Sequence, residues 1–284
     1  MKTALNKFLI LILFFYGSCT TKNIVNITDL PADVKEVSGT EIVIHSDLIW
    51  MVNDSGNKPK LFGLDAKGKI KKELKIDAKN HDWEDLTSDD QGNLYIGDFG
   101  NNDSKRKNLA ILKIQASSLT GDATVKVERI SFSYPDQKKF PPKKKQLYFD
   151  CEAFFYFNNN LYLFTKSRVK GDFGKTSVYK IPAEAGNHEA QLLGSFNSCA
   201  DSHCRITSAD ISPDKKTMIL LSQKAVLLFT NFEGDDFFNG TIKEFPFEHI
   251  SQKESICFKD ATTLYITDEK AHDTGGNLYE FHFN

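Results

Sequence analysis

The sequence predicts an all-β fold, a five-bladed β-propeller, and three observations support this. Helical periodicity is nearly absent, and short strands rich in Val, Ile, Leu, Tyr and Phe alternate with turns of Asn, Asp, Gly and Lys. One strand–turn–strand plan recurs five times. The last copy stops one strand short, while a spare strand-like stretch, residues 24–27, precedes the first copy.

The five copies follow one another through the whole mature chain. They begin at Glu36, Trp83, Cys151, Thr207 and Lys253. A third strand is predicted in each, at residues 60–65, 109–114, 177–181, 225–230 and 277–283. A fourth strand follows in the first four copies, near residues 70–76, 125–134, 190–196 and 242–247. Four strands per repeat is the plan of a propeller blade.

The incomplete fifth copy predicts how the ring closes. Residues 24–27 are expected to supply the outer strand of the last blade. A sixth, degenerate blade within residues 116–146 is the alternative architecture. A β-sandwich is less favoured, because it would not explain five aligned strand–turn–strand units.

The N-terminus predicts export. Lys2 and Lys7 accompany an apolar run, residues 8–16, that is shorter than the ~20 residues of a membrane-spanning helix and suits a secretory signal. Two small residues stand directly before Cys19, which resembles a bacterial lipoprotein signal whose Cys becomes the lipidated first residue. An ordinary cleaved signal with an incidental Cys19 is the alternative.

These features predict three segments: a lipoprotein signal peptide (residues 1–18), the lipidated Cys19 with a short tether (19–23), and a single propeller domain (24–284). The expected location is the bacterial cell envelope, with the lipid in the outer membrane, on its periplasmic or surface face. The net charge of −2 gives no global field for nucleic acid, so no nucleic-acid partner is expected. A monomer is expected.

Export also bears on the remaining cysteines. Cys199 and Cys204 lie close together in a polar loop, where an oxidising compartment favours a local disulfide. Zinc is the alternative, with His203 the one further ligand at hand. Cys151 and Cys257 stand in apolar strand patterns, which is typical of buried thiols.

The first strand of every blade lines the channel of a propeller, so equivalent positions form a ring around the axis. Aligning the five copies places two serines and three glutamates at one such position: Ser38, Glu84, Glu152, Ser208 and Glu254. Carboxylates that converge on an axis raise one another's pKa unless they are protonated or bind a cation. Calcium fits best, because it accepts about 6–8 hard oxygen ligands in loose geometry.

The order Ser, Glu, Glu, Ser, Glu resembles the calcium-activated apyrases, five-bladed propellers in which a ring of Ser and Glu holds an axial calcium. The turn 53–56 (NDSG) stands where that family has an acidic turn ending in Gly. The resemblance covers the blade plan of the mature chain and implies Ca²⁺ as the cofactor. Only Arg168 stands where the family has paired arginines, which puts nucleotide hydrolysis in doubt. Segments 82–86 (DWEDL) and 150–154 (DCEAF) are also similar to bacterial phytase-like and esterase-like propellers.

Polar strand ends predict a mouth around the ring. Asp98 is the candidate to orient a water and Arg168 the candidate to take developing charge. The candidates for substrate binding are Asp54, Lys166, Asp268 and Glu269.

Two functions therefore remain open. The first is an exported calcium-dependent hydrolase of a phosphate ester or anhydride, anchored to the membrane by its lipid and acting on a small phosphorylated substrate. The second is a non-catalytic envelope module that docks a glycan or protein and whose axial calcium is structural. The fold cannot choose between them, so whether the protein is an enzyme stays open.

Overall fold

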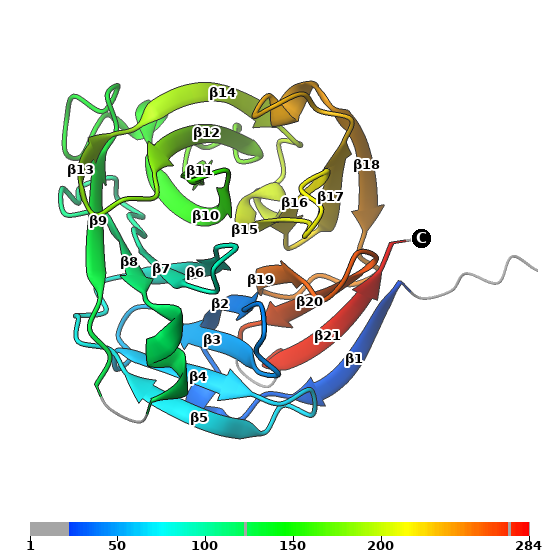
Figure 1. Ribbon diagram of the computed structural model, residues 1–284. Helices are drawn as coiled ribbons and strands as arrows, with labels where there is room; N and C mark the ends of the chain where they lie inside the picture. Colours follow the sequence, from blue (N-terminus) through cyan, green and yellow to red (C-terminus); the bar gives the residue numbers. More distant parts are fainter. Residues whose placement is uncertain (1–22, 122–123, 272–273, 284) are drawn as a thin grey trace, which may run out of the picture.

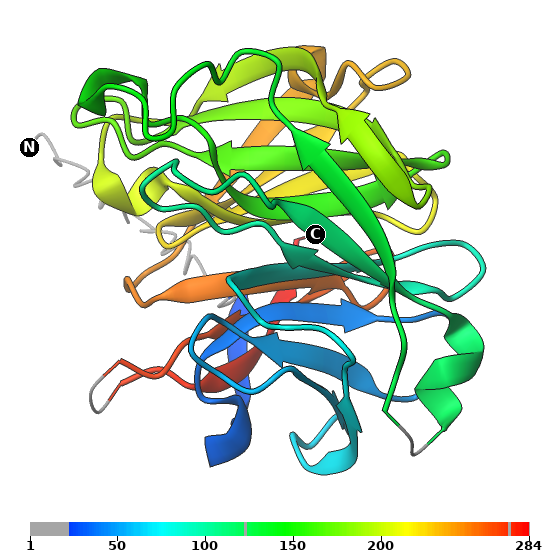
Figure 2. The same ribbon diagram turned by 90° about the vertical axis from the view of Figure 1, so that its left-hand side faces the viewer.

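Five β-sheets arranged as a ring form the protein (Figure 1). The computed structural model describes residues 23–121, 124–271 and 274–283. These residues contain strands and short 3₁₀ turns but no α-helix. Figure 2 shows the ring edge-on, with loops projecting at both ends of the axis. The predicted five-bladed β-propeller is confirmed.

Each blade has an inner strand beside the axis and three strands that follow it outward. The inner strands are β2 (Val37–Ile42), β6 (Trp83–Ser88), β10 (Asp150–Phe157), β15 (Ile206–Ile211) and β19 (Lys253–Phe258). The second strands are β3 (Ile49–Asn53), β7 (Leu94–Asp98), β11 (Asn160–Lys166), β16 (Thr217–Ser222) and β20 (Thr263–Asp268). The third strands are β4 (Lys60–Leu64), β8 (Ala110–Ile114), β12 (Lys175–Pro182), β17 (Ala225–Thr230) and β21 (Asn277–His282). The outer strands are β5 (Ile70–Lys75), β9 (Glu128–Ser133), β14 (Gln191–Asn197), β18 (Thr241–Pro246) and β1 (Ile24–Asp29).

The ring closes through the N-terminal strand, as the incomplete fifth repeat predicted. β1 pairs antiparallel with β21, from Ile24 opposite Phe281 to Asp29 opposite Asn277 (Figure 1). Most β1 side chains are exposed or half-buried. Backbone hydrogen bonds, rather than apolar burial, therefore hold this closing strand.

The alternative of a sixth blade is wrong. The described residues within 116–146 contribute one strand, β9, and two 3₁₀ turns, η2 (Ala116–Thr120) and η3 (Lys144–Gln146). The sequence did not reveal β13 (Gly186–Glu189), which leaves the third blade and pairs parallel with β9 of the second. This short strand covers an outer edge that would otherwise lack hydrogen-bond partners.

Apolar side chains fill the spaces between neighbouring blades. Between the second and third blades, Phe99 packs edge-to-face on Phe154 with ring centroids 5.2 Å apart. Trp50 and Trp83 are buried in the corresponding layer between the first and second blades. This packing of sheet on sheet fixes where each inner strand stands around the axis.

The cysteines divide as their context suggested. Cys199 and Cys204 form a disulfide, with their Cα atoms 5.9 Å apart, beside η4 (Ser202–Cys204). Cys151 and Cys257 are buried thiols. No helix within the described residues is long and apolar enough to cross a bilayer. The predicted signal peptide and Cys19 lie outside those residues.

Removal of β1 tests the closure of the ring. A chain that starts at Leu30 loses the pairing with β21, and each backbone hydrogen bond contributes about 1 kcal/mol net. At this chain length 1 kcal/mol moves Tm by about 2–4 °C, so we expect Tm to fall by about 10 °C relative to a chain that starts at Asn23. Calorimetry of both chains checks this. Equal Tm values would show that β1 does not close the ring in solution.

Candidate functional site

A β-bulge near the start of every inner strand places one extra residue at the same end of the axis. The register shifts fall between Val37 and Gly39, Trp83 and Leu86, Cys151 and Ala153, Ile206 and Ser208, and Lys253 and Ser255. Four of the predicted ring residues lie in these bulges: Ser38, Glu84, Glu152 and Glu254. Bulges re-aim side chains in this way at the rims of closed sheets.

In the fourth blade the residue in the bulge is Thr207, not Ser208. Thr207 Oγ1 donates to the backbone oxygen of Lys253 in the next blade at 2.8 Å. Ser38 Oγ makes the matching bond to Trp83 at 2.8 Å. Ser208 lies one position further along and donates to Asp85 Oδ2 at 3.0 Å. The sequence alignment missed this shift because the turns after the inner strands differ in length.

Four of the five bulged residues, all except Thr207, line a cavity of about 170 Å³ at this end of the axis, which we call the mouth. Most of its lining is charged. The predicted site residues among the lining are Ser38, Asp54, Glu84, Glu152, Lys166, Arg168, Glu254 and Glu269. The structure therefore brings most of the sequence-predicted residues into one place.

Glu152 is already paired with cations. Lys166 Nζ lies 2.8 Å from Glu152 Oε2, and Arg168 Nη2 lies 2.9 Å from Oε1. Arg168 Nε also pairs with Asp150 Oδ2 at 2.5 Å. Burial alone would raise the pKa of Glu152, but Lys166 and Arg168 outweigh burial and hold that pKa below its usual value. This half of the mouth is thus balanced in charge.

Asp54 and Glu84 line the other half of the mouth and, with Asp82 beside them, form a cluster that we call the carboxylate triad. One oxygen of each residue lies within 4.8 Å of the others. No ion pair joins any of the three to a Lys or Arg among the described residues. Burial is the largest cause that raises the pKa of Asp54, to about 7. Burial and then the charge of Glu152 raise the pKa of Glu84 well above its usual value. No lysine or arginine side chain of the described chain pairs with the triad, so its carboxyls tend to hold protons in the metal-free protein, and a bound cation could take the place of those protons.

Gly100 makes room for the triad. A Cβ at this position would collide with Glu84 Oε1 and would lie 2.6 Å from Asp82 Oδ2. Contacts below about 3 Å force a neighbour to shift. Only glycine lets the two carboxylates approach the backbone here.

Asn80 ties the triad to two blades. Its Nδ2 donates to the backbone oxygens of Asn53 at 3.1 Å and Asp54 at 2.8 Å, at the end of β3. Its Oδ1 accepts from Trp83 N at 3.1 Å, at the start of β6. The amide therefore holds the segment that carries Asp54 against the segment that carries Asp82 and Glu84.

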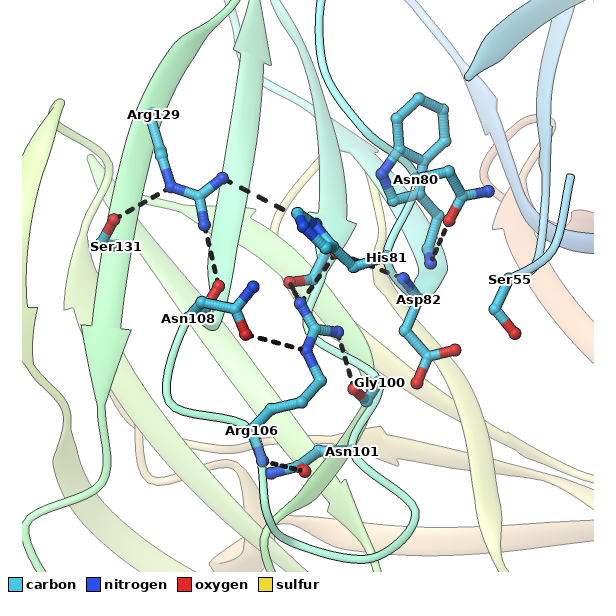
Figure 3. Close-up of polar contacts among 12 residues, drawn as sticks. Ser55, Asn80, His81, Asp82, Gly100, Asn101, Arg106, Asn108, Arg129 and Ser131 are labelled. Atoms are coloured by element: carbon cyan, nitrogen blue, oxygen red, sulfur yellow. Dashed lines mark hydrogen bonds and ion pairs between the residues drawn. The ribbon is translucent and has the colours of Figure 1, made fainter. Parts of the chain in front are cut away.

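Asp98, the residue predicted to orient a water, is fully buried behind the triad. Its Oδ1 accepts from Asp82 N at 3.3 Å and from Arg106 Nη2 at 3.0 Å. Its Oδ2 lies 2.9 Å from His81 Nδ1. Arg106 Nη1 in turn donates to the backbone oxygen of Gly100 at 2.7 Å (Figure 3). Asp98 therefore positions the triad and does not contact the mouth.

Sequence reasoning missed His81, Asn80 and Arg106, the partners in this network. His81 stands directly before the acidic segment 82–85, which was the available signal. Asp268 was expected in the mouth but is buried elsewhere. It accepts hydrogen bonds from Asn277 N at 2.8 Å and Tyr279 OH at 2.9 Å. Glu269 does line the mouth, where Gln252 Nε2 donates to it at 3.0 Å.

The donor set of the triad fits a hard divalent cation. It offers carboxylate oxygens only, which suits Ca²⁺ or Mg²⁺ and not zinc or copper. The fit rests on carboxyl groups whose ionised forms have no lysine or arginine partner in the part of the chain that the structure describes, and on the space that Gly100 leaves, since both favour an added cation. Calcium itself remains a prediction.

Comparisons with known proteins agree with the fold. Neither a known protein family nor a curated protein sequence matches the chain. A gluconolactonase from Xanthomonas campestris aligns over 92% of this chain and 89% of its own, at 12% identity and a TM-score of 0.51. A catalytically inactive virginiamycin B lyase from Staphylococcus aureus with quinupristin aligns over 90% and 69%, at 15% identity and a TM-score of 0.44. Hydrazine synthase from Kuenenia stuttgartiensis aligns over 82% and 56%, at 12% identity and a TM-score of 0.42.

At such identities the gluconolactonase shows a shared propeller fold and nothing about chemistry. Fold and mouth together define the chain as a five-bladed β-propeller with an acidic axial mouth. The resemblance to the calcium-activated apyrases stays a prediction.

Gly100→Ala tests the triad as a cation site. The added methyl group should push Glu84 and Asp82 apart and weaken calcium binding at least about tenfold, or about 1.4 kcal/mol. Gly194→Ala is the control, because its Cβ would meet one atom of Phe238 at 4.0 Å. Calorimetric titration with calcium compares the two variants. Unchanged affinity in Gly100→Ala would place the cation elsewhere.

The raised pKa of Asp54 also predicts how calcium stabilisation depends on pH. In the metal-free protein this pKa is about 7, above the unfolded value of about 4, so protonation favours the folded state. That contribution is present below about pH 4 and is lost as the pH rises through 7. Calcium needs ionised carboxylates, so excess calcium should raise Tm by about 5–10 °C at about pH 8 and by almost nothing at about pH 5.

Thermal melts with calcium or chelator across this pH range measure the effect. Asp54→Asn should abolish the rise in Tm that calcium causes at about pH 8. Asp210→Asn is the control and should leave this rise in Tm unchanged. Asp210 has a similarly raised pKa of about 7, but it lines a cavity at the far end of the axis. A calcium shift of equal size at all pH values would contradict the prediction.

Proposed function

We propose that this chain is an exported, calcium-dependent hydrolase of a phosphate ester or anhydride, held at the cell envelope by a lipid on Cys19. One observation carries the proposal. Asp54 and Glu84 of the triad, which no lysine or arginine of the described residues pairs with, line the same mouth as Lys166 and Arg168. A cation beside a fixed guanidinium is a suitable pair for one anionic substrate group.

The residues of the mouth fit distinct tasks in such a reaction. Calcium, when bound, supplies a positive charge that polarises a phosphoryl oxygen. Arg168 is held by Asp150 and Glu152 and keeps about a quarter of its side chain exposed, so it can donate to an oxygen on which charge develops.

Asp54 is the better candidate for the water-orienting role that the sequence assigned to Asp98. Asp54 lines the mouth beside Glu84, where its carboxylate can accept a hydrogen bond from a water. Asp98 is buried and hydrogen-bonded on both oxygens, so its part is to hold Asp82 in place.

Export is supported by chemistry in the folded domain as well as by the N-terminal pattern. The disulfide between Cys199 and Cys204 is typical of oxidising compartments. Attachment to the outer membrane through Cys19 is proposed from the sequence pattern, because that residue lies outside the described part of the chain.

One feature favours the second candidate, a binding module with a structural cation. The charges of Lys166 and Arg168 are already matched by Glu152 and Asp150, which leaves less net attraction for a phosphate. In that case the mouth docks an envelope glycan or protein and the cation holds the inner strands together.

Phosphate release separates the two candidates. The purified protein is assayed with calcium against p-nitrophenyl phosphate and inorganic pyrophosphate, and Glu84→Gln should lower turnover at least about 100-fold, or about 2.7 kcal/mol. Glu41→Gln is a matched control, because Glu41 is an equally buried glutamate of an inner strand that lines the far cavity. If the protein binds calcium but releases phosphate from neither substrate, the result would favour the second candidate, a non-catalytic binding module.

A further inference from the structure

A second cavity, of about 340 Å³, adjoins the mouth and shares Lys166, Arg168, Gln252 and Glu254 with it. Its remaining lining includes Arg205 and His203. We propose that this cavity is a separate anion-binding pocket centred on Arg205, which takes an oxyanion group, a phosphate or a carboxylate, of a small ligand. The inference does not rest on hydrolysis or on calcium.

Arg205 lacks the carboxylate partner that Arg168 has. No ion pair joins it to an acidic side chain among the described residues, and its buried Nε has no hydrogen-bond partner. Burial, and then the positive charge of Arg168, lowers the pKa of Arg205. A half-buried guanidinium beside a second cation is unfavourable, and a bound anion would offset the repulsion between the two arginines.

The position of Arg205 is fixed before any ligand arrives. Its guanidinium carbon lies 4.2 Å from the centroid of the Phe173 ring. The disulfide between Cys199 and Cys204 ends at the preceding residue. A Cβ on Gly174 would collide with the backbone oxygen of Cys199, so the disulfide loop packs tightly on the neighbouring segment. A side chain held in this way loses little conformational freedom on binding.

The chemistry of the pocket favours an oxyanion over other ligands. A planar guanidinium matches the two oxygens of a phosphate or carboxylate group. Lys166, which also pairs with Glu152, and His203, whose Nδ1 lies 2.9 Å from Asp201 Oδ1, offer further hydrogen-bond donors in the lining. The one carboxylate in the lining, Glu254, has its pKa raised to about 7, chiefly by burial, so it opposes an anion only weakly at neutral pH.

Titration calorimetry on metal-free protein tests the pocket, with inorganic phosphate and acetate as separate probes. The protein is stripped on a chelating resin so that no soluble chelator competes as an anion. Phosphate, acetate or both should bind the natural protein, and Arg205→Met should weaken that binding at least about tenfold. Lys216→Met removes one charge from an exposed turn at the far end of the axis and should change nothing.

A second measurement does not depend on a variant that folds. Phenylglyoxal modifies arginine side chains, and bound phosphate should slow its reaction at Arg205 in the natural protein, as read by peptide mass spectrometry. Tight phosphate with weak acetate identifies a phosphate pocket, and the reverse identifies a carboxylate pocket. Absence of binding for both probes, equal affinity in Arg205→Met, or no protection of Arg205 would overturn the inference. Because no metal is present, failure of the calcium site cannot imitate these results.

Discussion

A single buried carboxyl, Asp85, joins three blades at the centre of the propeller. It belongs to the second blade and accepts from Phe154 N of the third at 3.3 Å, and from Ser208 Oγ at 3.0 Å and Ala209 N of the fourth at 3.4 Å. Burial raises its pKa well above the usual value, and these donors partly offset that effect. The blades pack on one another mainly through apolar faces, and the hydrogen bonds of Asp85 add directional contacts between three of them. These bonds fix how far apart the inner strands stand and therefore how the residues of the mouth are spaced.

The mouth above Asp85 handles its negative charge in two ways. Glu152 and Asp150 are paired with Lys166 and Arg168, which makes a rigid ionic network. The triad of Asp54, Asp82 and Glu84 has only hydrogen-bonded supports behind it. The ion pairs of Glu152 and Asp150 fix the positions of those side chains. The carboxyls of the triad have no such partners within the described chain and would be stabilised by a cation, so we expect function on the triad side of the mouth.

Several functional groups, unlike Glu84 and Glu152 of the inner strands, come from segments between strands. Asp54 follows β3, Asp82 precedes β6, and Arg205 follows the disulfide loop before β15. Each is fixed by a contact with a neighbouring segment: Asn80 for Asp54, Asp98 for Asp82 and Phe173 for Arg205. Propellers with unrelated chemistry can share this ring because such segments vary while the packing between blades does not.

The sequence by itself determined the five blades and the closure by β1, because strand alternation and the repeat are local patterns along the chain. It also placed Glu84, Glu152 and Glu254 near the axis, since the inner strand of a blade can be recognised from the repeat. Only the tertiary structure decided which carboxylates are paired, that Thr207 takes the place expected of Ser208, and that Asp98 and Asp268 are buried. Those outcomes depend on bulges and on distances between side chains of different blades. The sequence identifies each carboxylate but does not show whether its neighbour across the axis is a lysine or another acid.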